Sequence, residues 1–251
     1  GLLKRKRFAM RLTDFKALTF DCYGTLIDWE TGMMQALGGL IVKSRRTLSR
    51  DSILEAHARH ESAQQRQTPA KRYSDLLAIV YKRLAEEWGV PASIDECEDY
   101  GRSIRHWPAF ADSPGALQYL KKFYKLIILS NVDNRSFSFS NAKLGVQFDA
   151  IYTAEDIGSY KPDDRNFVYM LEHAGDLGLA KTDILHTAES LFHDHVPARR
   201  HGFANCWIHR RHAQEGFGAT MDPGQTPEID FKFNSMAELA EAHRKALQAS
   251  P

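Results

Sequence analysis

Asp21 is the residue of this 251-residue chain that is best placed for chemistry, because it directly follows the run Ala17–Phe20 and precedes a Gly-containing turn. A short apolar run closed by such a turn predicts a buried strand that feeds a loop. Gly24 lets the backbone turn tightly, and the amides of the loop can then face an anion. A carboxylate held there can serve as a covalent nucleophile, whereas an isolated Asp after a strand equally often only caps the loop.

A second polar site, Ser130-Asn131, follows the predicted strand 126–129. Its hydroxyl and amide can bind a substrate oxygen. Taken alone, the pair serves equally well as the N-cap of the next helix. We therefore count it toward a site only together with Asp21.

Two charged residues complete the candidate set. Lys161 can pair with Asp21, which keeps the carboxylate ionised and lets an anionic substrate bind beside it. Asp194 lies beyond the predicted strand 184–187 and can orient or deprotonate a water molecule. The alternatives are ordinary ones, a solvated lysine and an acid at an exposed helix end.

The elements that must position these residues alternate between strands and helices. Such alternation predicts parallel strands joined by right-handed crossovers, that is, an α/β fold with a doubly wound sheet. Ligands of open parallel sheets bind at the carboxyl ends of the strands, which is where the four polar sites fall. After the strand that precedes Asp21, the predicted strands are 126–129, 150–152, 184–187, 204–208 and 231–233, with helices such as 165–174 and 236–247 between them.

Residues 29–111 interrupt this alternation and carry almost no strand signal. Apolar residues at helical spacing predict one helix around residues 53–61 and another over residues 76–88. Ser93 and Glu96 form the pattern of a capping box for the next helix. The segment therefore reads as a small helical module.

The predicted organisation is an α/β core with an inserted helical cap. The core is built from residues 12–28 and 112–251, and the cap, residues 29–111, closes over the carboxyl edge of the sheet and excludes water. Residues 1–11, with a basic run, are expected to be a disordered leader.

Composition excludes several classes of partner. The 33 basic and 32 acidic residues leave a net charge of +1, which gives no electrostatic reason to expect nucleic acid or an anionic membrane. No apolar run approaches the roughly 18 residues of a membrane span. The three cysteines form no CxxC pair, which argues against a disulfide framework or a zinc site and favours a reducing, cytoplasmic location.

The order Asp21, Ser130-Asn131, Lys161-Pro162 and Asp194, with a helical insert after the first motif, resembles the haloacid dehalogenase (HAD) superfamily. The resemblance implies a Rossmann-type core, a helical cap and Asp21 as nucleophile. Phosphatases of the superfamily usually carry a second Asp where this chain has Tyr23, whose reference pKa of about 10 does not suit that role. The pattern Asp-x-Tyr-Gly-Thr-Leu instead is similar to the type II L-2-haloacid dehalogenases.

This resemblance implies a role for each candidate residue. Asp21 displaces the C2 substituent of a small carboxylic acid, Ser130 and Asn131 bind the carboxylate of that substrate, and Lys161 steadies Asp21. Asp194 then helps water to hydrolyse the ester. No cofactor is expected, and a homodimer is compatible with the resemblance.

Two departures from the dehalogenase pattern keep alternatives open. First, the arginine that cradles the halide is not matched securely by Arg45, Arg46, Arg50 or Arg59. Second, Glu189 stands where the dehalogenases carry Ser. With Asp194 it resembles the acidic pair that holds Mg²⁺ in HAD phosphatases, so a Mg²⁺-dependent phosphatase stays an alternative.

The stretches 20–30 and 186–195 also resemble a dehalogenase relative that opens the strained ring of L-azetidine-2-carboxylate. There the leaving group is a protonated ring amine, so no acid is needed at Tyr23, and Glu189 is expected to hold an ammonium. A non-catalytic interaction protein on a HAD scaffold is the third hypothesis, against which the intact Asp21, Lys161 and Asp194 argue.

Aromatic and histidine residues near these motifs are weaker candidates. Trp107, Phe110 and Phe192 are expected either to line an apolar pocket or to pack in the core. His193 and His195 flank Asp194, and a structural role is favoured for both over a titrating one.

Overall fold

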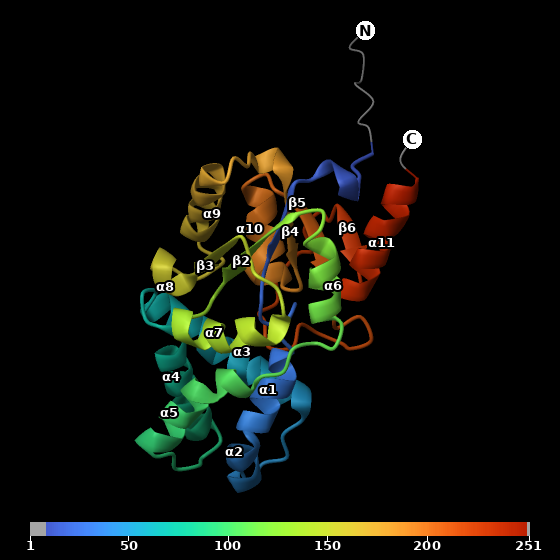
Figure 1. The fold of residues 1–251 in the computed structure, drawn as a ribbon. Coiled ribbons are helices and arrows are strands. Elements are labelled where there is room, and N and C mark those ends of the chain that lie inside the picture. The colour runs from blue at the N-terminus through green and yellow to red at the C-terminus, as the bar shows by residue number, and fades with distance from the viewer. Residues whose placement is uncertain (1–8, 250–251) are drawn as a thin grey trace.

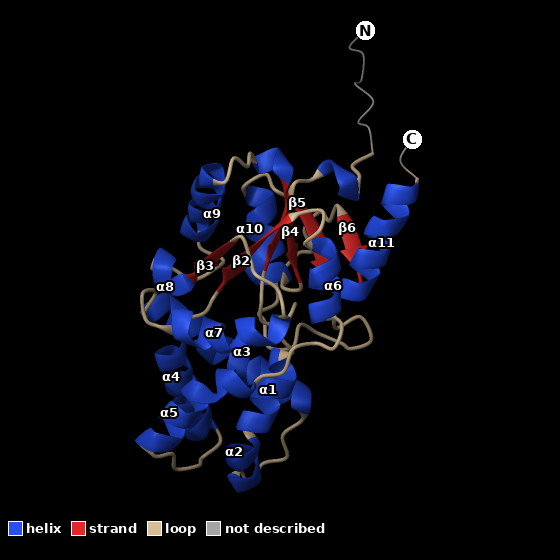
Figure 2. Cartoon of the chain, in the orientation of Figure 1, coloured by secondary structure: helices blue, strands red, loops and turns tan. Residues whose placement is uncertain are grey.

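The computed structural model describes residues 9–249, so the expectation for residues 1–8 of the leader lies outside the described residues. Its centre is a six-stranded sheet in the order β3-β2-β1-β4-β5-β6, with every neighbouring pair parallel (Figures 1 and 2). The strands are β1 (Ala17–Phe20), β2 (Lys125–Ser130), β3 (Ala150–Thr153), β4 (Ile184–Ala188), β5 (Ala204–Ile208) and β6 (Phe231–Phe233).

The predicted strands are confirmed to within one residue at each end, and the doubly wound α/β fold is confirmed. β1 lies between β2 and β4, and the chain passes from one side of β1 to the other when it crosses from β3 to β4. This reversal creates a topological switch point at the carboxyl end of β1, where Asp21 follows the strand.

Helices cover both faces of the sheet because its side chains alternate between two apolar layers. Ala17, Ile127 and Leu129 pack with α9 and α10, whereas Leu18 and Ile128 point to the face covered by α6, α7 and α11. The helices that cover the sheet are α6 (Ser113–Leu120), α7 (Asn134–Leu144), α9 (Asp164–Asp176), α10 (Val196–Arg200) and α11 (Met236–Gln248), and α8 (Ala154–Ile157) is a short turn after β3.

Between Trp29 and His106 every regular element is a helix, and Figure 2 shows these helices gathered below one edge of the sheet. Ser93 and Glu96 form the predicted capping box. No helix within residues 9–249 combines the length and apolar character needed to cross a membrane. The helices are α1 (Trp29–Ala36), α2 (Gly38–Lys43), α3 (Arg50–Gln67), α4 (Tyr73–Glu87), α5 (Ile94–Arg102) and the 3₁₀ turn Ser103–His106.

The helical segment is tied to loops that follow strands. The N–H of Ser74, in α4, donates to Asp133 Oδ1 at 3.0 Å in the loop after β2. The Tyr160 hydroxyl, in the loop after α8, donates to the carbonyl of Lys71. These contacts hold α3 and α4 over the carboxyl edge of the sheet.

The chain passes into and out of the helical segment at one place. Ile27 pairs with Ala109 as an isolated antiparallel bridge. Next to it, the N–H of Asp28 donates to Pro108 O at 2.8 Å and the N–H of Phe110 donates to Leu26 O at 3.0 Å. The two chain segments that enter and leave the helical segment therefore lie side by side.

Candidate active site

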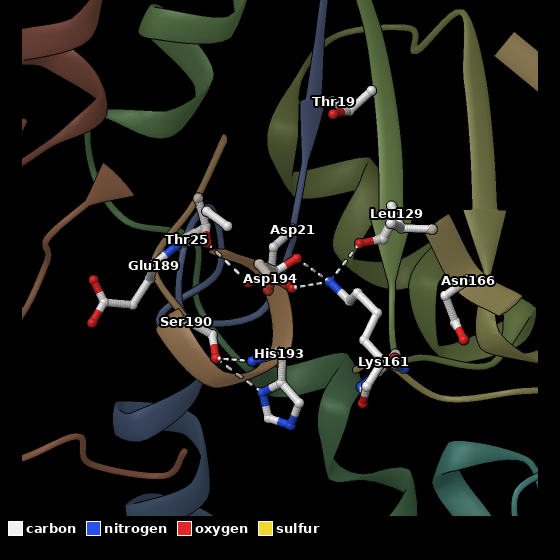
Figure 3. A network of polar contacts seen from close by, with 12 residues as sticks. Thr19, Asp21, Thr25, Leu129, Lys161, Asn166, Glu189, Ser190, His193 and Asp194 are labelled. Atoms are coloured by element: carbon white, nitrogen blue, oxygen red, sulfur yellow. Dashed lines mark hydrogen bonds and ion pairs between the residues drawn. The ribbon is translucent and has the colours of Figure 1, made fainter. Parts of the chain in front are cut away.

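The ammonium of Lys161 lies at the centre of the candidate active site (Figure 3). Its Nζ is 3.0 Å from Asp21 Oδ1 and 2.8 Å from Asp194 Oδ1, and it donates a third bond to Leu129 O at 2.8 Å. Only 1% of Lys161 is exposed. The three charged residues predicted from sequence are thus brought together from loops that follow β1, α8 and β4.

Burial and charge set the protonation of this cluster. Burial raises the pKa of Asp21 and Lys161 opposes that rise, so that the pKa comes to about 6. Burial acts on Asp194 too, but Lys161 and His186 together hold the pKa of Asp194 well below its usual range. Lys161 keeps a raised pKa because its two carboxylate partners outweigh desolvation. At neutral pH the site holds one ammonium between two carboxylates.

Thr25 was not singled out from the sequence, yet it fixes the second oxygen of Asp21. Its hydroxyl donates to Asp21 Oδ2 at 2.9 Å and accepts from the N–H of Glu189 at 2.9 Å. Gly24, with φ of 92°, makes the turn that brings Thr25 back toward Asp21. The loops after β1 and β4 are therefore joined through one hydroxyl.

His186 is a second residue that sequence reasoning missed. Its Nε2 donates to Asp194 Oδ1 at 2.8 Å, and its Nδ1 accepts from the Thr19 hydroxyl at 2.8 Å. Both histidine and threonine are fully buried in neighbouring strands. The sequence signal that could have identified His186 is a polar residue within a predicted buried strand. Since His186 and Lys161 share Oδ1, Oδ2 of Asp194 is left buried without a hydrogen bond among the described residues.

Ser130 and Asn131 have different environments although they are adjacent. The Ser130 hydroxyl is buried and has no hydrogen-bond partner among the described residues. The Asn131 amide, in contrast, donates to and accepts from the backbone of Lys161. Neither residue caps the next helix, whose N-cap is Asp133. Ser130 is thus the member of the pair that is free to bind a ligand.

A narrow cavity of about 20 Å³ lies beside Asp21, with room for about one water molecule. The core contributes Asp21, Ser130 and Lys161 to its wall. The helical segment contributes Glu61, which the sequence pattern placed only in the amphipathic helix around residues 53–61, and Tyr73, which sequence reasoning missed. The site is therefore almost dry as it stands.

Glu189 lines a larger cavity of about 180 Å³, and Figure 3 shows its side chain directed away from Lys161. Its Oε2 accepts from the N–H of Arg210 at 2.9 Å, and burial raises its pKa to about 8. Asp21, Asp194 and Glu189 therefore do not converge on one point. No three His, Cys, Asp or Glu side chains of residues 9–249 lie together in a way that could hold a metal ion.

None of the four arginines considered for a halide cradle lines the cavity beside Asp21. Arg50 lines the larger cavity and is 3.8 Å from Glu30. Arg59 pairs with Glu87 on the surface at 3.0 Å. Arg45 and Arg46 line none of the cavities described.

The aromatic candidates are spread over several places. Trp107 is buried behind Tyr23, with ring centroids 5.7 Å apart, and lines neither cavity. Tyr23 lines both cavities, and its hydroxyl is 2.8 Å from Ser140 Oγ. Phe110 lines the larger cavity, and Phe192 lines a third one of about 380 Å³ that also contacts Lys161.

The two histidines beside Asp194 also differ. His195 is fully buried and its Nε2 donates to Ala188 O at 2.7 Å, which is a structural contact. His193 lines the narrow cavity, and its Nδ1 lies 3.0 Å from Ser190 Oγ. Burial lowers the pKa of both to about 4, so both are neutral at pH 7.

Comparison with known proteins places this geometry in a family. The chain is 28% identical over 236 residues to an (S)-2-haloacid dehalogenase of Pseudomonas sp. (strain YL), which covers 92% of this chain and 95% of that protein. It is also 25% identical over 225 residues to (S)-2-haloacid dehalogenase H-109 of Pseudomonas putida. This match covers 84% of this chain and 91% of that protein.

Solved structures share the fold. The defluorinating L-2-haloacid dehalogenase Rha0230 superposes with a TM-score of 0.74 at 19% identity and covers 94% of this chain and 100% of its own. The L-2-haloacid dehalogenase from Xanthobacter autotrophicus with chloropropionic acid covalently bound gives a TM-score of 0.73 at 17% identity. That match covers 92% of this chain and 98% of the solved structure's chain. A family model described as haloacid dehalogenase-like hydrolase matches residues 15–186. The chain therefore belongs to the haloacid dehalogenase-like hydrolases.

Proposed function

We propose that this protein hydrolyses a small C2-substituted carboxylic acid through a covalent ester on Asp21. The observation that carries the proposal is the buried contact of Lys161 Nζ with both Asp21 Oδ1 and Asp194 Oδ1. This contact holds the proposed nucleophile, Asp21, and the second carboxylate, Asp194, against the single ammonium of Lys161. The names of the curated relatives, (S)-2-haloacid dehalogenases, support the substrate class.

The first step forms the ester. A carboxylate oxygen of Asp21 attacks C2 of the substrate, and the C2 substituent leaves from the opposite face with the bonding electron pair. The unpartnered Ser130 hydroxyl donates to the substrate carboxylate, and Lys161 supplies the positive charge beside it. Asn131 keeps Lys161 in place through its backbone.

The second step hydrolyses the ester at the Asp21 carbonyl carbon. Asp194 Oδ2, which has no hydrogen bond among the described residues, accepts a proton from the attacking water. The products are a 2-hydroxy acid and a free Asp21 carboxylate. His186 bonds the other oxygen of Asp194 and so leaves Oδ2 free to accept that proton.

The helical segment acts as a cap in this scheme. A cavity with room for about one water does not admit a substrate of several heavy atoms, so the segment has to move away from the sheet edge to let the acid bind. Its return excludes water from the first step. Tyr23 donates no proton in either step, which suits leaving groups that need none, either a halide or the ring amine of L-azetidine-2-carboxylate.

The test is turnover by the purified, EDTA-treated enzyme of L-2-chloropropionate, fluoroacetate, L-azetidine-2-carboxylate and p-nitrophenyl phosphate. We expect metal-free release of halide or of ring-opened product, and a mass increase on the peptide that contains Asp21 in single-turnover samples. Asp21→Asn should abolish both. Phosphate release that appears only with added Mg²⁺, or turnover that Asp21→Asn leaves unchanged, would contradict the proposal.

A further inference from the structure

A buried carboxyl group from the helical segment lines the narrow cavity together with Asp21. Glu61, in α3, is 2% exposed and lines the same cavity as Asp21, Ser130 and Lys161. An acidic side chain buried to this extent normally has a charged or hydrogen-bonding partner.

Glu61 is only half satisfied by the protein. Its Oε1 accepts from the Tyr73 hydroxyl. Its Oε2 has no hydrogen bond within residues 9–249, and no Lys or Arg side chain of that range forms an ion pair with it. The Oε2 atom is thus available to a ligand in the cavity.

The neighbours of Glu61 are neutral. His57, one turn earlier in α3, has a pKa lowered to about 3 by burial, and its Nε2 is bonded to the Tyr100 hydroxyl of α5. The hydroxyls of Tyr73 and Tyr160, from α4 and the loop after α8, are uncharged, because burial raises the pKa of both. Across the cavity the charged groups are Asp21 and Lys161, which already pair with each other.

This wall is suited to a cation and not to a halide ion. A halide leaving group would develop its negative charge next to a buried carboxyl, and no arginine of residues 9–249 lines the cavity to compensate that charge. A protonated amine placed there would instead gain a buried, charge-assisted hydrogen bond.

We propose that Glu61 binds a protonated nitrogen on C2 of the substrate, and that it thereby selects the ring amine over the halide, the two leaving groups that the proposed function leaves open. This inference rests on the proposed function, since it uses the ester on Asp21. It assigns Glu61 to the leaving group and Ser130 with Lys161 to the carboxylate.

The step balances without an added acid. Asp21 oxygen forms a bond to C2 as the C2–N bond breaks, and the electron pair stays on nitrogen. A ring ammonium, R₂NH₂⁺, thereby becomes a neutral primary amine, which takes up a proton from solvent. Burial raises the pKa of Glu61 to about 7, and a bound ammonium would stabilise its carboxylate form. An unstrained amine is a poor leaving group, which is why ring strain is part of the substrate class.

The test compares two ligands that differ only at this nitrogen, L-azetidine-2-carboxylate and (S)-oxetane-2-carboxylate. Their binding is measured by calorimetry on full-length protein carrying Asp21→Asn, which blocks turnover. We expect the amine to bind at least tenfold more tightly than the oxygen analogue. Adding Glu61→Gln should remove that preference and leave binding of the oxetane within about twofold.

Two further variants separate this role from a structural one. Glu55→Gln changes an exposed carboxylate of the same helix and should leave the preference intact. Tyr73→Phe removes the hydroxyl that orients Glu61 and should reduce the preference while keeping the carboxyl group. Melting curves establish that each variant is folded.

The outcomes keep the two proposals apart. Equal binding of both rings, binding of neither, or a preference that survives Glu61→Gln would overturn the role of Glu61. If L-2-chloropropionate still forms an ester on Asp21 in that case, the proposed function stands. If no acid of the panel forms an ester, the proposed function itself falls.

Discussion

The side-chain amide of Asn131 and the backbone of Lys161 are joined by two reciprocal hydrogen bonds: Nδ2 donates to Lys161 O at 3.0 Å, and Lys161 N–H donates to Oδ1 at 2.7 Å. Asn131 follows β2, whereas Lys161 lies on the loop after α8. These two hydrogen bonds therefore fix the backbone position of Lys161, whose ammonium contacts both carboxylates. A small shift of this backbone displaces the ammonium from Asp21 and Asp194 at once.

Replacing Asn131 with Ala should mainly reduce kcat. Loss of both bonds lets Lys161 move, and a displacement of about 1 Å can cost about a hundredfold in rate, so we expect a fall of ten- to a hundredfold with KM changed less than threefold. Ser130→Ala is the control, because the free hydroxyl is expected to act in substrate binding and to alter KM instead. Steady-state kinetics on the acid that is turned over measures both. A rise in KM alone for Asn131→Ala would mean that its amide binds substrate directly.

Activity should depend on the ionisation of Asp21. Only its carboxylate is a nucleophile, and burial raises its pKa to about 6 against the opposing effect of Lys161. The rate kcat/KM should therefore fall about tenfold for each pH unit below 6 and level off above about pH 7. A pH–rate profile from pH 4 to pH 8 measures this. An acid limb with a midpoint near 4 would show that Lys161 compensates burial in full.

Asp21→Asn should make the protein more stable at neutral pH. A raised pKa means that folding favours the protonated acid, so the ionised wild-type group lowers the free energy of unfolding as pH rises from about 4 to 6. We expect a gain on the order of 1–3 kcal/mol at pH 7 and little gain at pH 3.5. Urea unfolding at both pH values measures it. Asp194→Asn is the matched control and should destabilise instead, because Lys161 and His186 hold the pKa of Asp194 low.

His186→Phe should slow ester hydrolysis more than ester formation. His186 holds Oδ1 of Asp194 and leaves Oδ2 for the water. We expect a tenfold or greater accumulation of the ester on Asp21 during turnover, detected by mass spectrometry of the quenched enzyme. Thr19→Val keeps the imidazole but removes its Nδ1 partner and should have a smaller effect in the same direction. An unchanged ester level would assign His186 to packing alone.

Arg211→Ala should destabilise the protein through Glu30. The two residues form a buried ion pair at the wall of the larger cavity, with 5% of Arg211 and 9% of Glu30 exposed. Removing Arg211 leaves the buried Glu30 carboxylate with only the half-exposed Arg50, 3.8 Å away, so the loss should approach the cost of breaking a buried ion pair, about 3–5 kcal/mol. Arg244→Ala breaks an exposed pair with Glu241 and should cost less than 1 kcal/mol. Chemical denaturation of both variants measures the free energy of unfolding. Equal losses in the two variants would contradict this prediction.

The sheet and the charged centre of the site follow from the sequence for a common reason. Apolar runs such as Ala204–Ile208 end at glycine or polar residues, which marks each strand to within a residue. Because parallel strands present their carboxyl ends at one edge, Asp21, Lys161 and Asp194 were expected to meet there. Their contacts in the structure agree with that expectation.

The remaining contacts depend on loop geometry that spacing does not encode. Glu61 recurs at helical spacing with apolar residues, and periodicity alone does not distinguish a core position from a cavity wall. Nothing in the sequence next to Asn131 indicates that its amide meets the backbone thirty residues later. Trp107 could equally have lined a pocket, and only the packing against Tyr23 decides its place.

The bridge between Ile27 and Ala109 has a consequence for the history and redesign of this enzyme. Since the chain leaves the sheet domain and returns to it at adjacent points, a short linker could close the gap without disturbing any strand. The intervening helices thus form an exchangeable cassette. Recombination at this splice point would exchange the helical wall of the narrow cavity while preserving Asp21, Lys161 and Asp194.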